Sequence, residues 1–260
     1  MADVCAPITL IGLGRSGTTL IEKAFESSAE VYAGGETGGI IFGTYAGAMD
    51  SYFQSVYTDD ADRNEFSARV VRRCFESLFP IGSYWHWFHK PAGIPKMIAW
   101  ERYRTSRDKF EFPTEWYWSV LNTVFVRGRY LTVLRNPWDI VRSRMIFSGW
   151  DEKGGWEDIK IMYDIVYRNI ENINIIFFDD LVAQPYEEIS KLFNKLGLQV
   201  PYDLREVVST KYVPTETGRD TLPLVLEGPD YDIETASLIT NLWDRFGKVF
   251  NSPNGALFFD

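Results

Sequence analysis

The sequence predicts a three-layer α/β fold, in which a central, mostly parallel sheet carries helices on both faces. Short apolar, β-rich runs recur along the chain between turn residues, as is typical of strands buried on both sides. Helical patterns separate these runs, which is the order of elements in a sheet built with crossover helices. The 260 residues contain no repeat or Pro/Gly-rich linker, so residues 1–260 are interpreted as a single domain.

Each element is expected where its pattern is clearest. The strands are Ile8–Leu13, Met97–Trp100, Tyr130–Leu134 and Asn174–Phe178. The helices are Thr18–Ser28, Ala61–Phe79, Thr114–Val126, Pro137–Phe147, Trp156–Glu171, Pro185–Leu196 and Ile233–Phe246. A short β-like segment, Val31–Thr37, follows the first helix. Less regular stretches, such as 79–112, fit insertions that line a ligand crevice at the carboxyl ends of strands.

Aromatic residues make up 16% of the chain and are dense at Tyr84–His89 and Trp116–Trp118. Such clusters either pack in a core or an interface, or form the wall of a ligand pocket. The sequence leaves both interpretations open.

Composition excludes several classes of function. A net charge of −9 argues against a nucleic-acid partner and against a polyanionic acceptor. No apolar run approaches the roughly 20 residues of a membrane span, and the start of the chain lacks the basic region of a signal peptide. The two cysteines, Cys5 and Cys74, have neither disulfide nor metal-site spacing. We therefore expect a cytoplasmic protein with no metal and no membrane partner.

The strongest motif is a glycine-rich loop between the first strand and the first helix, with the sequence Gly12-Leu13-Gly14-Arg15-Ser16-Gly17-Thr18-Thr19. Such loops let backbone N–H groups converge on an anion, and the helix dipole adds to the attraction. The spacing is P-loop-like, but Thr18 stands where the P-loop has Lys. Because the cation is instead Arg15, a shorter anion than ATP fits better. A glycine turn without a ligand is the alternative.

The run Arg15-Ser16-Gly17-Thr18-Thr19 resembles the 5′-phosphosulfate loop, [KR]-[ST]-G-T-[TS], of sulfotransferases that use 3′-phosphoadenosine-5′-phosphosulfate (PAPS). The resemblance implies PAPS as the donor, adenosine 3′,5′-bisphosphate as the product, and no metal. It also implies that Gly14 to Thr19 bind the donor, with Arg15 at the bridging oxygen of the leaving phosphate.

A second motif follows the strand Tyr130–Leu134. Asn136 suits a helix N-cap and Pro137 its first turn, so Arg135 is expected at a strand's carboxyl end, where ligands bind. In the same family an Arg and a Ser eight positions apart hold the 3′-phosphate. The resemblance therefore implies that role for Arg135 and Ser143, since 143 − 135 = 8.

Two weaker matches lie farther along the chain. Phe178 stands where the family has a Tyr that approaches the nucleotide, so stacking or packing is all that its ring can provide. Arg219 resembles the Arg of a late G-R-W segment that closes over the 3′-phosphate, although Asp220 replaces the Trp. Arg219 either contacts the phosphate or is a solvated loop charge.

An attacking hydroxyl loses its proton, so a carboxylate or an imidazole near the acceptor helps the reaction. Glu36 is the first candidate, because it resembles the Glu base of tyrosylprotein sulfotransferases, which lies in a similar G-E-T context. A helix-start carboxylate is the alternative interpretation. His86 and His89 are the competitors, because phenol-type sulfotransferases use a His.

Lys96, at the start of the expected strand Met97–Trp100, resembles the family Lys that contacts the transferring group. An exposed Lys at a strand edge is the alternative, because the flanking residues differ from the family pattern.

The function expected from these residues is in-line transfer of a sulfuryl group from PAPS to a hydroxyl or nitrogen of a small molecule. An acidic, Trp-rich chain suits a cationic or neutral natural product of secondary metabolism. One rival function is a P-loop small-molecule or nucleotide kinase, for which Asp179 and Asp180 are the nearest candidate Mg²⁺ ligands. The other rival is a nucleotide-binding module without catalysis.

Overall fold

A computed structural model describes residues 2–50, 60–91, 114–148, 152–209 and 233–248. Within them, five parallel strands form one sheet in the order β2-β3-β1-β4-β5. The strands are β1 (Ile8–Ile11), β2 (Val31–Glu36), β3 (His86–Lys90), β4 (Arg129–Leu134) and β5 (Ile173–Phe177). The predicted three-layer α/β fold with a parallel sheet is confirmed.

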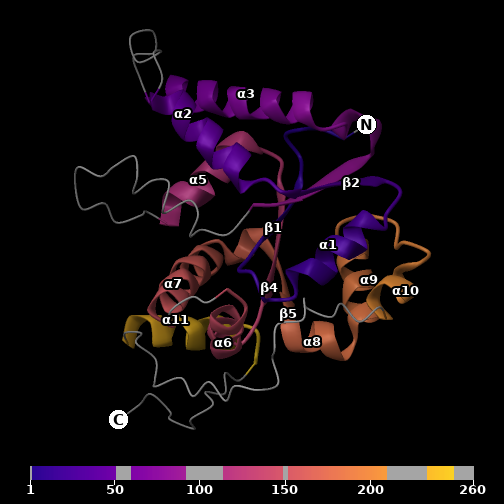
Figure 1. Ribbon diagram of the computed structural model, residues 1–260, viewed down its shortest axis with the longest axis vertical. Helices are drawn as coiled ribbons and strands as arrows, with labels where there is room; N and C mark the ends of the chain where they lie inside the picture. Colours follow the sequence, from indigo (N-terminus) through magenta and orange to yellow (C-terminus); the bar gives the residue numbers. More distant parts are fainter. Residues whose placement is uncertain (1, 51–59, 92–113, 149–151, 210–232, 249–260) are drawn as a thin grey trace.

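Helices cover both faces of the sheet (Figure 1). One face packs against α1 (Thr18–Glu26), α8 (Phe178–Ala183), α9 (Pro185–Lys195) and α10 (Leu204–Ser209). The other face packs against η1 (Gly39–Gly43), α2 (Thr44–Asp50), α3 (Asp60–Leu78), α5 (Thr114–Val124), α6 (Pro137–Ser148), α7 (Glu152–Arg168) and α11 (Ile233–Asp244). Two short 3₁₀ turns, η3 (Ile81–Ser83) and η4 (Ile170–Asn172), precede β3 and β5.

A hydrophobic core lies on each face of the sheet. The strands contribute side chains to both cores because successive side chains point to opposite faces. On β4, Leu131 and Val133 join the core under α1 and α9, whereas Tyr130 and Leu134 join the core under α5 and α7. This burial on both faces explains why the strands appear in the sequence as nearly continuous apolar runs.

The expected elements that fall on described residues agree with the structure, which also contains elements that were not expected. All seven expected helices are present, and so are the strands expected at the positions of β1, β4 and β5. Met97–Trp100 lies outside the described residues. The strand β3, which was not expected, overlaps the aromatic cluster Tyr84–His89 and ends at Lys90. Within that cluster Trp87 is buried in the core, whereas Trp85 is exposed.

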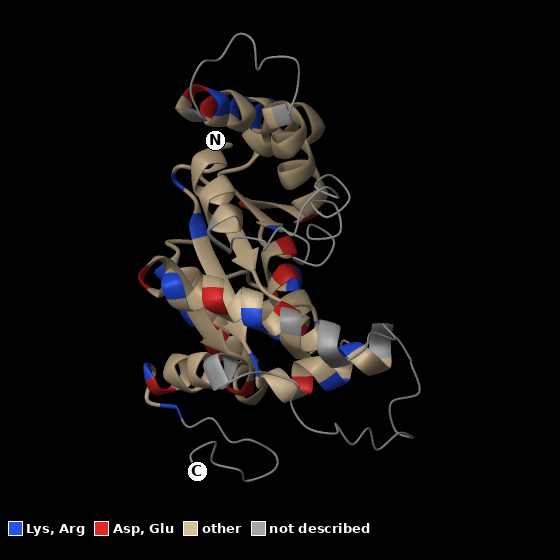
Figure 2. Ribbon diagram, turned by 90° about the vertical axis from the view of Figure 1, so that its left-hand side faces the viewer, with Lys and Arg blue, Asp and Glu red and all other residues tan. Residues whose placement is uncertain are grey.

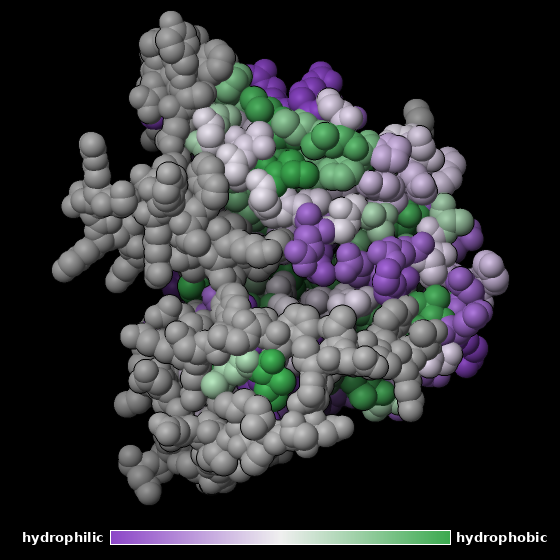
Figure 3. Space-filling view, in the orientation of Figure 1, coloured by the Kyte–Doolittle hydropathy of each residue, from purple (hydrophilic) through white to green (hydrophobic). Residues whose placement is uncertain are grey.

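The surface is mixed in character. No described helix is long and apolar enough to cross a membrane. Figure 2 shows basic and acidic residues interspersed along the helices. Figure 3 shows the face seen in Figure 1, and on its described part apolar areas are separated by hydrophilic ones. Cys5 and Cys74 are both free thiols.

Candidate active site

Polar and glycine-rich segments lie at the carboxyl ends of four strands, at one edge of the sheet. The loop from Gly12 to Gly17 follows β1, and Arg135 follows β4. Glu36 is the last residue of β2, and Lys90 is the last residue of β3. Because the strands are parallel, these carboxyl ends face the same side, which is where ligands bind in such folds.

The glycine-rich loop has an unusual backbone. Arg15 has φ 78° and Gly17 has φ 85°, and among the described residues Arg15 is the one non-glycine with a positive φ. This conformation costs a non-glycine residue about 1–2 kcal/mol. The buried Ser16 lies between the two, and its hydroxyl donates to the carbonyl of Leu13 at 2.7 Å. Strained backbone of this kind concentrates at binding and catalytic sites.

Phe178 joins the loop to the second motif. A Cβ on Gly17 would lie 3.0 Å from Cδ2 of Phe178, and Gly17 has φ 85°, so the ring and the backbone conformation together favour glycine at this position. The guanidinium carbon of Arg135 lies 4.3 Å from the centre of the same ring, in cation–π geometry. Phe178 therefore packs between the two motifs, as expected of a ring without a hydroxyl.

Direct hydrogen bonds connect the same segments. Nη1 of Arg135 donates to the backbone carbonyl of Arg15 at 2.6 Å, and Nε of Arg15 donates to Oγ of Ser143 at 3.0 Å. Oδ1 of Asn136 accepts from the backbone N–H of Trp138 at 3.0 Å, which is the expected cap at the start of α6. The structure thus brings together Arg15, Arg135 and Ser143.

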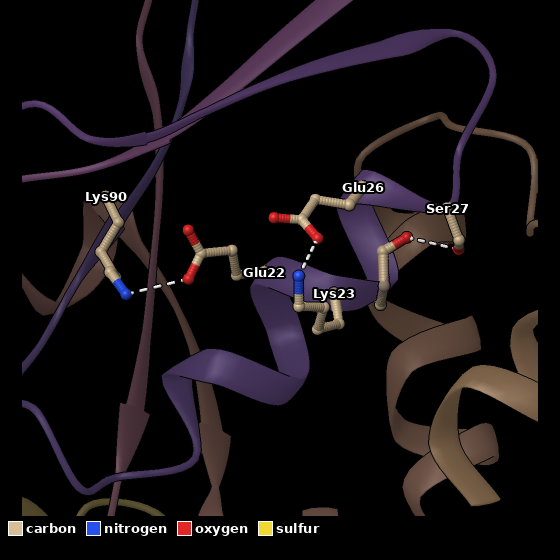
Figure 4. Close-up of polar contacts among 6 residues, drawn as sticks. Glu22, Lys23, Glu26, Ser27 and Lys90 are labelled. Carbon is tan, nitrogen blue, oxygen red and sulfur yellow. Dashed lines mark hydrogen bonds and ion pairs between the residues drawn. The ribbon is translucent and has the colours of Figure 1, made fainter. Parts of the chain in front are cut away.

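A lysine that the sequence analysis did not single out lies between two carboxylates. Nζ of Lys90 is 2.9 Å from Oε2 of Glu22, on α1, and 3.5 Å from Oε1 of Glu36. Figure 4 shows Lys90 and Glu22 pointing toward each other. Lys90 is only 14% exposed, whereas Glu36 is 56% exposed. The sequence feature that could have identified Lys90 is its position as a cation directly after an aromatic run and directly before Pro91.

Neither histidine is an exposed side chain at the carboxyl edge of the sheet. His89 is fully buried, and both of its ring nitrogens are within hydrogen-bonding distance of threonine hydroxyls. His86 begins β3, so it lies at the opposite end of the strand from Lys90. Burial, with a smaller contribution from the nearby Arg129, lowers the pKa of His86.

Two predicted site residues, Lys96 and Arg219, lie outside the described residues. The proposed magnesium ligand Asp180 accepts a hydrogen bond from Nζ of Lys248 at 2.7 Å. In the described part of the chain, no group of three or more His, Cys, Asp or Glu side chains is arranged to hold a metal ion.

Comparison with known proteins gives the family. The model of the sulfotransferase family matches residues 7–202, which include the loop after β1 and the motif after β4. The chain matches no curated protein.

Solved structures with the same fold are also sulfotransferases. The sulfotransferase domain of the olefin synthase of Synechococcus PCC 7002 is 13% identical, with a TM-score of 0.57 over 95% of this chain and 96% of that domain. The sulfotransferase domain from the curacin biosynthetic pathway is 14% identical, with a TM-score of 0.54 over 91% and 97%. Sulfotransferase STF9 from Mycobacterium avium is 9% identical, with a TM-score of 0.53 over 96% and 79%. At these identities the likeness concerns the fold.

Proposed function

The chain belongs to the sulfotransferase family, and from that premise we propose that it transfers the sulfuryl group of PAPS to a hydroxyl or nitrogen of a small molecule. The observation that carries the proposal is the contact between Arg15 and Ser143, with Arg135 bonded to the same loop. Two anion-binding motifs that touch in this way suit one nucleotide with phosphates at both its 5′ and its 3′ positions.

The residues present fit the donor. Gly14 to Thr19 lead into the amino end of α1, where backbone N–H groups and the helix dipole favour an anion. Arg135 and Ser143 supply the donors for the 3′-phosphate, and Arg135 is already oriented by the Phe178 ring. Arg219 remains a further candidate for that phosphate.

In the proposed reaction the acceptor oxygen or nitrogen attacks sulfur in line with the bond to the phosphate. A new bond to sulfur forms, the bond from sulfur to the bridging oxygen breaks, and adenosine 3′,5′-bisphosphate leaves with the electron pair. Arg15 stabilises the charge that grows on the leaving phosphate. Glu36 accepts the proton of the acceptor, since it is an exposed carboxylate that lies beside Lys90 at this edge of the sheet.

Lys90 is proposed as the cation for the transferring sulfuryl group, because it lies beside Glu36 at the end of β3. Lys96, which the family resemblance suggested for that contact, stays a second candidate.

We propose a cationic or neutral, partly apolar natural product as the acceptor. The net charge of −9 and the half-exposed Glu36 favour it over an anion. Two of the similar structures come from an olefin synthase and from the curacin pathway, which supports a role in secondary metabolism.

The proposal is tested by a screen of acceptors with PAPS, read by mass spectrometry for a gain of one sulfuryl group. Thermal stabilisation separates the rival functions, since a ligand stabilises the protein that binds it. Adenosine 3′,5′-bisphosphate without metal should raise the melting temperature of this protein, whereas ATP with Mg²⁺ should raise that of a kinase. Nucleotide binding without turnover of any acceptor would identify a binding module.

A further inference from the structure

A buried histidine ties together three neighbouring strands on one face of the sheet. His89 lies on β3, between β1 and β2. Its Nε2 is 2.8 Å from the hydroxyl of Thr9, on β1, and its Nδ1 is 2.6 Å from the hydroxyl of Thr37, which directly follows β2. All three side chains are at most 1% exposed.

The surroundings of His89 make these two hydrogen bonds necessary. The imidazole stacks on Trp87, with ring centres 4.8 Å apart, and meets the edge of Phe125 at 5.1 Å. A polar group in such an apolar core is costly unless it is hydrogen-bonded. The imidazole is uncharged there, because burial lowers the pKa of His89 to about 3.

Thr37 is held at several points, and its bond to His89 is one of them. Its backbone N–H donates to the carbonyl of Lys90 at 3.0 Å. Its own carbonyl accepts from the N–H groups of Ile40 and Ile41, at 3.0 and 3.1 Å, where the chain turns into η1. Thr37 therefore fixes the point at which β2 ends and the next segment begins.

Glu36 depends on that fixed point. It is preceded by Gly34 and Gly35, and Gly35 has φ 65°, so the chain before Glu36 is conformationally permissive. The pairing of β2 with β3 also shifts register between Ala33 and Glu36. The exposed side chain of Glu36 is thus placed by its own pairing with Lys90 and by the fixed residue that follows it.

We propose that His89 is a positioning residue, which through its hydrogen bond to Thr37 holds Glu36 beside Lys90 for sulfuryl transfer. The proposal rests on the role of Glu36 proposed above. His89 is fully buried, so it acts through Thr37, and its second bond joins the ring to Thr9 on β1 rather than to the segment that carries Glu36.

Thr37→Val and Thr9→Val form a matched pair of tests, because each removes one hydroxyl from one nitrogen of the same buried ring. Both variants should lower the melting temperature. Thr37→Val should also lower kcat about 10- to 100-fold with an unchanged KM for PAPS, since small misplacements of a catalytic group have effects of that size. The kcat of Thr9→Val should stay within about twofold of that of the unaltered protein, which is far less than the loss expected from a misplaced catalytic group. Equal losses of kcat in the two variants would overturn the proposal.

Substitution of His89 itself gives a second, independent test. An Asn amide can occupy the position of Nδ1 and keep the bond to Thr37, whereas a Gln amide reaches the position of Nε2 and keeps the bond to Thr9. His89→Asn should therefore retain more kcat than His89→Gln at similar melting temperatures. The opposite order would overturn the proposal.

Glu36→Gln, measured with the same PAPS and acceptor, separates this proposal from the one on which it rests. If Glu36→Gln is fully active, the assigned base is wrong. If Glu36→Gln is inactive and Thr37→Val behaves as Thr9→Val does, the base stands and the positioning role of His89 fails. Hydrogen exchange of the peptide 31–43, measured with adenosine 3′,5′-bisphosphate bound, should be faster in Thr37→Val than in Thr9→Val.

Discussion

Nε of Arg15 donates a hydrogen bond to Oγ of Ser143 at 3.0 Å, and this bond joins two residues 128 positions apart in the chain. It links the loop after β1 to the helix after β4. A nucleotide that carries phosphates at its two ends can be held by both segments at once, because they meet at one edge of the sheet.

The first prediction concerns the 3′-phosphate. Arg135→Ala and Ser143→Ala should weaken binding of adenosine 3′,5′-bisphosphate much more than binding of adenosine 5′-phosphate. Each contact to a charged phosphate should contribute about 1.5–3 kcal/mol. Calorimetric titration of both nucleotides measures the difference, with Ser209→Ala on the exposed part of α10 as the control. Equal losses for both nucleotides would remove the assignment.

The second prediction separates the charge of Arg15 from its backbone strain. Arg15→Ala and Arg15→Gly both remove the cation, so both should lower kcat severely while part of the nucleotide affinity remains. Because Arg15 has φ 78°, the Gly variant should be more stable than the Ala variant by about 1 kcal/mol. Activity assays and thermal melts measure the two effects. Unchanged kcat would exclude a role in the transition state, and activity abolished by EDTA would favour the kinase.

The parts of the site that could be predicted from the sequence are those marked by glycine, proline or helix-capping residues close together in the chain. The loop before α1 has glycines at fixed offsets, and α6 begins with an Asn cap followed by Pro137. Both signals act within a few residues, so they can be recognised without knowledge of the tertiary structure.

Lys90 and the buried role of His89 were not predictable in the same way. The run His86-Trp87-Phe88-His89 before Lys90 is aromatic throughout, and nothing in its pattern distinguishes a central strand from a pocket wall. The partners that define both residues, Glu22, Glu36, Thr9 and Thr37, lie at least 52 positions away. The pairing of β3 with β1 and β2, together with the packing of α1, which lies between those two strands in the chain, brings them together.

The third prediction concerns stability in acid. Burial lowers the pKa of His89 from its usual 6.5 to about 3, so the unfolded chain takes up this proton well before the folded one does. The contribution of His89 is therefore fully present above pH 6.5 and is lost as the pH falls toward 3, by at most about 1.4 kcal/mol per pH unit. Urea unfolding between pH 7 and pH 4.5 measures this slope. His89→Phe should flatten it, and parallel curves for the two proteins would contradict the prediction.

The last prediction concerns the proton of the acceptor. Glu36→Gln preserves the size and hydrogen bonding of the side chain beside Lys90 but cannot take up a proton. Because Glu36 lies on β2, away from the motif that contains Arg135 and Ser143, binding of adenosine 3′,5′-bisphosphate should be nearly normal by calorimetry. Turnover should fall by roughly 10²–10⁴-fold, the usual effect of losing a general base.

Glu26→Gln is the matched control for this change, since Glu26 is an exposed carboxylate on α1 that pairs with Lys23 (Figure 4), and its turnover should match that of the unaltered protein. A nitrogen acceptor has a different proton demand, so a smaller effect of Glu36→Gln would accompany N-sulfation. If Glu36→Gln keeps most of its activity while His86→Ala abolishes it, the base is a histidine. That outcome would require His86 to reach the acceptor from the amino end of β3, the end opposite to Lys90, and the geometry of the sheet argues against it.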